Sequence, residues 1–367
     1  IYIGAPSGGC WKTTNEGQTW EVLTDHLPVM GVSAIAIDYT DTDIIYIGTG
    51  DRDASDNYSI GVLKSTDGGQ NWETTGMQHS IYQNLTVEKL LIHPEDPDIL
   101  YCAVNNGLSR SYDGADSWEE ILNGHIDDIE FKPGDPNTIY AITKKFYKST
   151  NGGDSFVQIT EGLPSSNGRA QIAVTDAAPE YVYFMCAGTD GLFGGVYRST
   201  DSGDSFELRA DSPQMLGYSP TGDDNSSQSS YDLGLAASHL NPDEVHLLGI
   251  ITWRSMDGGI NWVATTEWNF QNDPIGYTHC DMHWAHFEGG TLYVGSDGLV
   301  CKSEDSGNTW TDLTTGIGIR QFYRMGGSKN HPYKIVGGSQ DNGTSVYTTD
   351  YWHEWLGADG MECAVDY

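Results

Sequence analysis

The sequence predicts an all-β protein, a β-propeller of four-stranded blades, and two repeats that run in step support this prediction. One repeat is a short turn motif that ends on tryptophan or phenylalanine. The other is a pair of alternating strands around a Pro/Asp turn. The composition agrees, because 45 glycines and 11 tryptophans among 367 residues are typical of short strands joined by tight turns.

The turn motif reads Ser/Thr-x-Asp/Asn-x-Gly-x-x-Trp/Phe and is complete in "KSTDGGQNW", residues 64–72. Its eight copies lie 38 to 56 residues apart, which brackets the length of one propeller blade. The third copy has lost its glycine, and the last has tryptophan in that place. The third position of the motif is occupied by Asn15, Asp67, Asp113, Asn151, Asp201, Asp257, Asp305 and Asp350.

The strand repeat predicts how each blade is ordered along the chain. Each unit reads strand A, a Pro/Asp turn, strands B and C, the turn motif and strand D. The chain opens on strands B, C and D of one blade and stops on an A-type strand at 361–367. Eight blades are therefore represented in one domain over residues 1–367, which we expect to be a segment of a longer protein. Closure by the last strand and a cut from a larger ring both stay open.

The acidic position of the turn motif is expected to be structural. Asp-Gly at Asp67 is a strong hairpin-turn signal, and an Asp side chain there accepts hydrogen bonds from backbone N–H groups. Asn replaces Asp at positions 15 and 151, which keeps the acceptor and removes the charge. A general acid or a nucleophile does not tolerate that exchange. These residues are therefore predicted to hold turns.

These motifs resemble Asp boxes, also called BNR repeats, of sialidases, xyloglucan hydrolases and sortilin-type propellers, over essentially the whole chain. The resemblance looks closest to sortilin-like propellers of secreted bacterial proteins, and the stretches that carry it are residues 6–20, 228–238, 338–344 and 357–367. It implies that the Asp boxes lie on outer C–D hairpins, away from the ligand face. Because sortilin-type propellers have ten blades, a ten-bladed ring is an alternative to eight.

The catalytic residues of these families are not matched. Sialidases use an Arg-Ile-Pro stretch, and none of the eight arginines here lies in one. Xyloglucan hydrolases carry a catalytic Asp in a Thr-Asp-Ile-Gly-Gly segment, and the matching stretch "APSGG", residues 5–9, has Pro6 in its place. We therefore expect a chain without catalytic residues, and a glycoside hydrolase acting on a polysaccharide is the alternative.

The stretch "YTHCDMHWAHF", residues 277–287, is the strongest ligand candidate. In an inner strand, His279, Asp281 and His283 would alternate onto the face that lines the channel. His279 and Asp281 would then be near enough to share a metal ion, whereas a hydrogen-bonded polar lining is the alternative. Other polar residues at strand ends are expected at the same channel mouth: Asp51, Arg52, Asp53, Asp232, Gln340, Asp341 and Asn342.

Three further features leave alternatives open. Asp51, Asp53 and Asp56 alternate as calcium ligands do but lack a bidentate Glu, so an acidic solvated loop competes with a calcium site. The insertion at 211–232 suits either recognition or disorder. The six cysteines form no CxxC pair, which disfavours zinc and leaves free thiols and disulfides open. No cofactor is required on this view, and Ca²⁺ or another divalent cation is the ion that would suit the chain.

The charge restricts the partners. Eighteen Lys and Arg stand against 52 Asp and Glu, and a net charge of −34 repels nucleic acid and anionic membranes. No apolar run approaches the ~18 residues of a membrane helix. The sequence thus predicts a secreted or cell-surface propeller that serves adhesion, binding or scaffolding, with glycan or protein ligands and without catalysis. A structural subunit that assembles with other surface subunits is the second alternative.

Overall fold

The structure, a computed structural model, describes residues 1–55, 57–268, 276–357 and 359–365. The chain clusters into two compact units, Ile1–Gly316 and Ile317–Tyr367. Within the described residues it forms eight antiparallel sheets, the first with three strands and the others with four. The predicted all-β fold with eight represented blades is confirmed, and so is the opening of the chain on three strands of a blade. One domain over residues 1–367 stays a prediction.

The first unit holds seven sheets. Blades 1 to 3 are built from β1 (Tyr2–Ala5), β2 (Gly9–Lys12) and β3 (Glu21–Val22), then β4 (Val32–Ile37), β5 (Ile45–Thr49), β6 (Gly61–Ser65) and β7 (Glu73–Gln78), then β8 (Val87–Ile92), β9 (Leu100–Val104), β10 (Gly107–Ser111) and β11 (Glu119–Asn123). Blades 4 and 5 are built from β12 (Asp128–Lys132), β13 (Asp135–Ile142), β14 (Phe146–Ser149) and β15 (Val157–Ile159), then β16 (Ala170–Val174), β17 (Val182–Ala187), β18 (Phe193–Ser199) and β19 (Glu207–Ala210). Blades 6 and 7 are built from β20 (Gly234–Ala237), β21 (Val245–Leu248), β22 (Thr252–Ser255) and β23 (Val263–Ala264), then β24 (Met282–Glu288), β25 (Thr291–Ser296), β26 (Val300–Ser303) and β27 (Thr311–Asp312).

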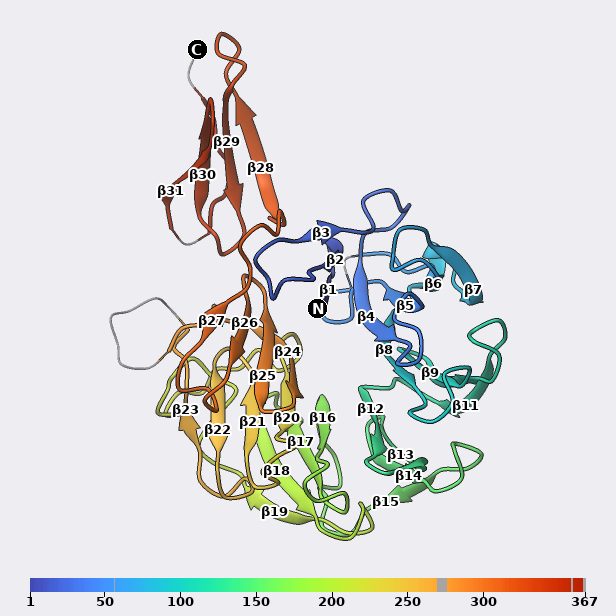
Figure 1. The fold of residues 1–367 in the computed structure, drawn as a ribbon. Helices are drawn as coiled ribbons and strands as arrows, with labels where there is room; N and C mark the ends of the chain where they lie inside the picture. The colour runs from blue at the N-terminus through green and yellow to red at the C-terminus, as the bar shows by residue number, and fades with distance from the viewer. Residues whose placement is uncertain (56, 269–275, 358, 366–367) are drawn as a thin grey trace. The chain divides into compact units, whose positions relative to one another are not determined.

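The blades of this unit stand around a common centre. The first strand of each sheet faces the centre and the last lies on the outside (Figure 1). β1 contacts β4, β4 contacts β8, and this succession continues through β12, β16 and β20 to β24. Clusters of buried apolar side chains pack between successive sheets. The hydrophobic core is therefore divided into layers between blades, and polar groups are left for the centre.

A basic residue just before each turn motif joins each blade to the next. Lys12 Nζ reaches Gly68 O at 3.4 Å, and Lys64 Nζ reaches Gly114 O at 3.0 Å. Lys302 of the seventh blade lies 3.6 Å from the Glu16 carboxylate of the first. The same side-chain type therefore links blade 7 to blade 1 as it links blade 1 to blade 2.

Two of the motif tryptophans repeat that closing contact. Trp72 Nε1 donates to Leu23 O of the preceding blade at 3.2 Å, and Trp20 Nε1 donates to Leu313 O of the seventh blade at 2.8 Å. Leu23 and Leu313 each follow their own motif tryptophan by three residues. The first unit therefore closes with seven blades, not with the eight or ten that the sequence left open.

The Asp-box residues hold turns at the outer hairpins. Ser65 Oγ donates to Asp67 Oδ1 at 2.9 Å, while Asn71 N donates to the same oxygen at 2.8 Å. Hydrogen bonds from Asn71 lower the pKa of Asp67 to about 2. Asn151 accepts the equivalent bonds, from Ser149 Oγ at 2.9 Å and Ser155 N at 3.0 Å. An amide and a carboxylate thus make the same turn.

The second unit is one sheet of β28 (Phe322–Gly327), β29 (Lys334–Ser339), β30 (Thr344–Thr348) and β31 (Trp352–Leu356). Asp350 lies in its β30–β31 turn. The A-type strand predicted at 361–367 is wrong as far as residue 365, because the structure gives residues 361–365 no strand. Gly360 N donates to Ser339 O at 2.8 Å, which ties this segment beside β29 without a ladder. Residues 366 and 367 lie outside the described residues.

The structure bears on two features that the sequence left open, the state of the cysteines and the insertion at 211–232. All six cysteines are free, and Cys10, Cys102, Cys186 and Cys301 are buried. The insertion at 211–232 is described throughout, with Met215 and Leu216 buried in the core between blades 5 and 6. These two side chains pack the insertion against blades 5 and 6.

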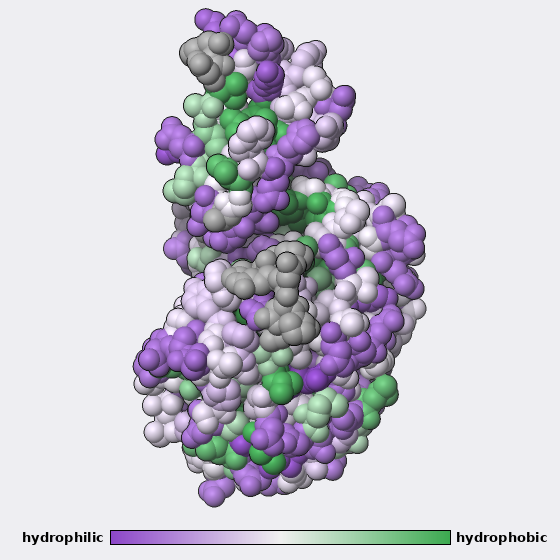
Figure 2. All heavy atoms as spheres, turned by 90° about the vertical axis from the view of Figure 1, so that its left-hand side faces the viewer, coloured by the Kyte–Doolittle hydropathy of each residue, from purple (hydrophilic) through white to green (hydrophobic). Residues whose placement is uncertain are grey.

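Hydrophilic side chains dominate the face drawn in Figure 2, where hydrophobic ones gather in small separate groups. The helix described is a short 3-10 turn, Ile81–Gln83. Among the described residues no helix has the length and apolar character needed to cross a membrane.

Candidate functional site

Polar side chains from four blades meet at one end of the channel of the first unit. His283 lies at the start of the A strand β24. The others come from the loops that follow B strands and from the segments that precede A strands, because both kinds of connection lie at the same end of a propeller. The Asp-box turns join C to D strands and so lie at the other end. We call this group the acidic centre, and its members are Arg52, Asp53, Arg169, Tyr231, Asp232, Asp281, His283 and Asp297.

The segment before β24 differs from its prediction. His279 and Asp281 each have a left-handed backbone, φ 61°, and β24 begins only at Met282, so their alternation with His283 along one strand is wrong. Asp281 N donates to Ile250 O at 3.2 Å, and Met282 N donates to Gly249 O at 2.9 Å. These bonds tie the segment to blade 6 before the β24 ladder starts, which explains the turned backbone.

His279 and Asp281 have different partners. His279 Nδ1 lies 3.2 Å from Cys280 O, and its ring lies against Gly298. Asp281 Oδ1 accepts from Gln228 Nε2 at 3.0 Å. A metal ion shared by His279 and Asp281 stays a prediction.

His283 lies between two carboxylates. Its Nε2 is 2.8 Å from Asp297 Oδ1, and its Nδ1 is 2.9 Å from Asp53 Oδ2, an ion-pair contact rather than a well-directed hydrogen bond. Tyr231 Oη donates to Asp297 with both oxygens at 3.0 Å. The chain Asp53–His283–Asp297–Tyr231 therefore connects blade 2 to blades 7 and 6.

Asp53 pairs with two arginines as well as with His283. Arg52 Nε donates to Asp53 Oδ1 at 3.2 Å, and Arg169 Nη2 donates to the same oxygen. Burial raises the pKa of Asp53, but Arg52, His283 and Arg169 together bring it well below its usual range. Burial likewise lowers the pKa of His283, while Asp297 and Asp53 raise it to about 9. At neutral pH the group is a buried set of opposite charges.

This raised pKa predicts a pH-dependent stability. Relative to the ordinary value of 6.5, His283 contributes stability that is fully present below pH 6.5 and is lost as pH rises through about 9. We expect the free energy of unfolding, measured by urea denaturation at pH 6, 7.5 and 9, to fall more steeply in the wild type than in His283→Gln. Equal pH slopes in the two proteins would contradict this assignment.

Asp232 is the most deeply buried carboxyl group of the acidic centre, with 1% of its surface exposed. Its backbone N donates to Gln228 O at 3.0 Å in a turn at the end of the insertion. Neither carboxyl oxygen has a hydrogen-bond partner among the described residues. Burial, followed by the charge of Asp281, raises the pKa of Asp232 to about 9.

The remaining predicted residues form turns, and their place at the channel mouth stays a prediction. Asp51 Oδ1 accepts from the backbone N of Asp53 and of Ala54 at 3.0 Å, a local turn. Asp56, the third residue of the proposed calcium run, lies outside the described residues. Gln340, Asp341 and Asn342 form the β29–β30 turn of the second unit, where Asp341 N donates to Asp359 Oδ1 at 3.1 Å.

Sequence reasoning missed several members of the acidic centre. Asp297 stands in a Ser-Asp-Gly turn after β25, and its place after a B strand was the available signal. Arg169 and Tyr231 carried no signal beyond their residue type. Glu88 on β8 was also missed, and burial, opposed by Arg52, raises the pKa of this carboxyl to about 7. On the same strand, Lys89 Nζ pairs with Asp128 of β12 at 2.7 Å.

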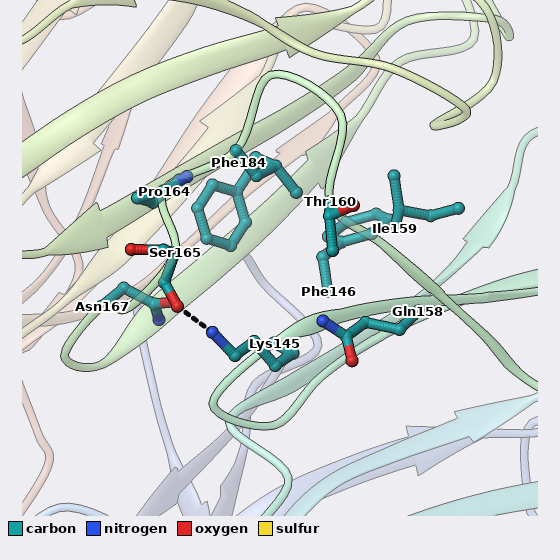
Figure 3. A pocket seen from close by; sticks show the side chains of 10 residues that line it. Lys145, Phe146, Gln158, Ile159, Thr160, Pro164, Ser165, Asn167 and Phe184 are labelled. Atoms are coloured by element: carbon teal, nitrogen blue, oxygen red, sulfur yellow. Dashed lines mark hydrogen bonds between the residues drawn. The ribbon is translucent and has the colours of Figure 1, made fainter.

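A separate hollow lies between blades 4 and 5 (Figure 3). Phe146, Leu163 and Phe184 are among its lining residues, and Lys145 Nζ donates to Ser165 O across it. No carboxylate, imidazole or thiol belongs to that lining. The acidic centre is therefore the better candidate for chemistry.

Comparison with known proteins shows which proteins this chain resembles in sequence. No family model matches the chain. It is 26% identical over 340 residues to xyloglucanase Xgh74A of Acetivibrio thermocellus. This match covers 77% of this chain and 38% of that protein. It is 25% identical over 322 residues to a Paenibacillus xyloglucanase, covering 75% of this chain and 30% of that protein. The chain thus spans about a third of the length of these curated relatives.

Solved structures agree on the fold. A GH74 enzyme of Niastella koreensis superposes with a TM-score of 0.67 at 18% identity, covering 95% of this chain and 57% of that one. The expected non-catalytic binding or scaffold protein is contradicted by these similarities, because the curated relatives are hydrolases, and the glycoside hydrolase alternative is favoured. Closeness to sortilin-type propellers is not shown. This chain is a β-propeller related to GH74 xyloglucanases.

Proposed function

We propose that the chain is part of a glycoside hydrolase that acts on xyloglucan. The observation that carries this proposal is the sequence similarity to xyloglucanases over about three quarters of the chain. Position 6 offers no acid–base chemistry, because Pro6 stands in the β1–β2 turn. A catalytic carboxylate of this chain must therefore come from elsewhere in the ring.

Asp297 is the carboxylate of the acidic centre that best suits a reacting role. Its side chain is 18% exposed, so substrate can reach it, whereas Asp232 is almost fully enclosed. Tyr231 Oη and His283 Nε2 both approach it as hydrogen-bond partners. Such donors orient a carboxylate and suit a base or a nucleophile better than a proton donor.

Two exposed aromatic rings lie close to the same centre. Tyr218 and Trp268 pack edge to face with ring centroids 5.7 Å apart, and they are 39% and 43% exposed. Burial first and then the charges of Asp281 and Asp232 raise the pKa of Tyr218. Exposed aromatic faces provide the apolar surface that sugar C–H groups pack against. This pair supports a carbohydrate ligand.

The test is release of reducing ends from xyloglucan by the full-length protein. We expect Asp297→Asn to lower the rate by about 10²-fold or more, since it removes a positioned carboxylate. Asp67→Asn is the matched control, because this exchange occurs naturally at positions 15 and 151 and should leave the rate unchanged. A wild-type protein that releases nothing from xyloglucan, or an Asp297→Asn variant at full rate, would refute the proposal.

A further inference from the structure

Blade 1 has one strand fewer than the other six blades of the ring. Each of blades 2 to 7 has an A strand at the inner edge of its sheet, from β4 to β24. In blade 1 the innermost strand is the B-type strand β1, and among the described residues β1 pairs with β2 alone. β1 therefore has one unpaired edge, and such an edge presents backbone N–H and C=O groups to which another strand can pair.

The ladder with β2 determines which backbone groups lie on that edge. Ile1 and Thr13 exchange two backbone hydrogen bonds, at 3.0 and 2.9 Å. Because bonded pairs alternate along an antiparallel ladder, Ile3 also faces β2, whereas Tyr2 and Gly4 direct their backbone groups to the opposite edge. Two N–H donors and two C=O acceptors therefore point away from β2.

The sequence of β1 indicates what kind of strand fits this edge. Residues 1–4, at β1, and residues 45–48, at β5, both read Ile-Tyr-Ile-Gly. β5 is paired on both sides, with β6 and with the A strand β4. In the ladder with β4, Ala34 and Ala36 stand opposite the glycine and the tyrosine of β5. The corresponding glycine and tyrosine of β1 are the two residues that face its unpaired edge.

The packing of β1 and β5 on the following blades agrees with this equivalence. A side chain at Gly4 would meet Val32 Cγ1, and one at Gly48 would meet Val87 Cγ1. Val32 and Val87 are the first residues of β4 and β8, the A strands of the two following blades. β1 therefore packs on its neighbour as β5 does, and its inner edge corresponds to the edge at which β5 pairs with β4.

Blade 7 offers a second contact surface for the same strand, on β24. Phe287 is buried in the core that blade 7 shares with blade 6. Because side chains alternate along a strand, Trp284 and His286 lie on the other face, which is turned toward blade 1. Trp284 is 51% exposed, whereas Ala236 of β20, which packs against blade 7, is 5% exposed. An A strand in blade 1 would cover Trp284 as blade 7 covers Ala236.

We propose that blade 1 binds an extended peptide strand of the β4 type at this edge. The peptide runs antiparallel to β1 and exchanges backbone hydrogen bonds with Tyr2 and Gly4. Its alternate side chains pack against Trp284 on one face and against β4 on the other, so that it becomes the innermost strand of the blade. Backbone pairing supplies the affinity and the alternate side chains supply the selection. The partner is therefore a peptide that alternates small and apolar residues.

The probe is a synthetic peptide of residues 31–39, which include β4, with a fluorophore at its C-terminus. We expect the full-length protein to bind one peptide per chain in a fluorescence anisotropy titration. Methylation of the peptide at the backbone nitrogen of Ala34 or of Ala36 should weaken binding by about tenfold, since these N–H groups pair with β1. Methylation at Ile35, whose N–H points away from β1, is the matched control and should leave the affinity unchanged.

Variants of the protein test the two contact surfaces separately. Tyr2→Pro removes one N–H from the unpaired edge and should weaken binding by about tenfold relative to Tyr2→Ala, which loses the same side chain and keeps the N–H. Trp284→Ala should weaken binding by about fivefold, because the peptide then buries less apolar surface. If Tyr2→Pro does not fold, the methylated peptides decide the question, since they leave the protein unchanged.

Two results would overturn the proposal. One is a wild type that does not bind the peptide, and gel filtration then shows whether a second copy of the chain occupies the edge instead. The other is equal affinity for the three methylated peptides, because the peptide then binds without a ladder. Since no readout involves hydrolysis, the result is independent of the proposed function.

Discussion

Asp53→Asn is expected to lower the free energy of unfolding by about 3 to 5 kcal/mol at pH 7, the cost of removing one partner of a buried ion pair. Asp53 is the single carboxylate that Arg52, Arg169 and one side of His283 share. The side chains of both arginines are about 15% exposed, so water does little to replace the lost charge. Urea denaturation measures the loss.

Asp67→Asn is the control for this substitution, since it makes the same chemical change in an exposed turn that tolerates asparagine elsewhere in the ring. Some of the loss at position 53 should be recovered above pH 9, where His283 is neutral and one of the three cations is gone. An Asp53→Asn protein within about 1 kcal/mol of the wild type would mean that the ion-pair set is not stabilising.

Trp20→Ala is expected to destabilise the first unit by about 2 to 3 kcal/mol, because it removes a half-buried aromatic ring and the bond to Leu313 O. In a closed ring this contact is no weaker than the contact between any two neighbouring blades. The loss should therefore match that of Trp72→Ala, which removes the equivalent bond to Leu23 O. Thermal and urea unfolding of the two variants provide the comparison.

The comparison separates a ring from an open arc. If blade 1 were a free edge, Trp20 would behave as a surface residue, and its removal would cost far less than that of Trp72. A Trp20→Ala protein with wild-type Tm beside a destabilised Trp72→Ala protein would therefore contradict closure with seven blades. A double variant adds a check, since opening the ring at one joint should change the cost of opening it at the next.

The blade pattern was predictable because local chemistry determines it. The turn motif needs only neighbouring residues, such as Ser65, Asp67 and Asn71, to make its hydrogen bonds. Alternating strands around Pro/Asp turns are also local. The number of blades in a ring is not local, because the eighth copy at Asp350 resembles the others while belonging to another unit.

One signal in the sequence does separate the eighth copy. The residue before the motif is Lys or Arg in the first seven copies and Tyr347 in the eighth. A basic side chain there bridges to the next blade, as Lys64 does at Gly114 O. Its meaning becomes visible only when the partner in the following blade is known.

The acidic centre was only partly predictable. Asp53, Asp232 and His283 stand at strand ends, and strand ends converge at a propeller mouth, so their residue types sufficed. Arg169 and Tyr231 join through contacts more than 50 residues away in sequence, which no local pattern encodes. The left-handed backbone of Asp281 likewise follows from bonds to blade 6 and not from its neighbours in sequence.

The contact between blade 7 and blade 1 has a consequence for how the first unit unfolds. In a linear array of repeats, the terminal repeats touch one neighbour and fray first, so unfolding proceeds from the ends. Because Lys302 meets Glu16 and Trp20 meets Leu313, no blade of this unit is terminal. Losing any single blade breaks two interfaces at once. We therefore expect the seven repeats to unfold as one cooperative unit, although each repeat is built from the same local pattern.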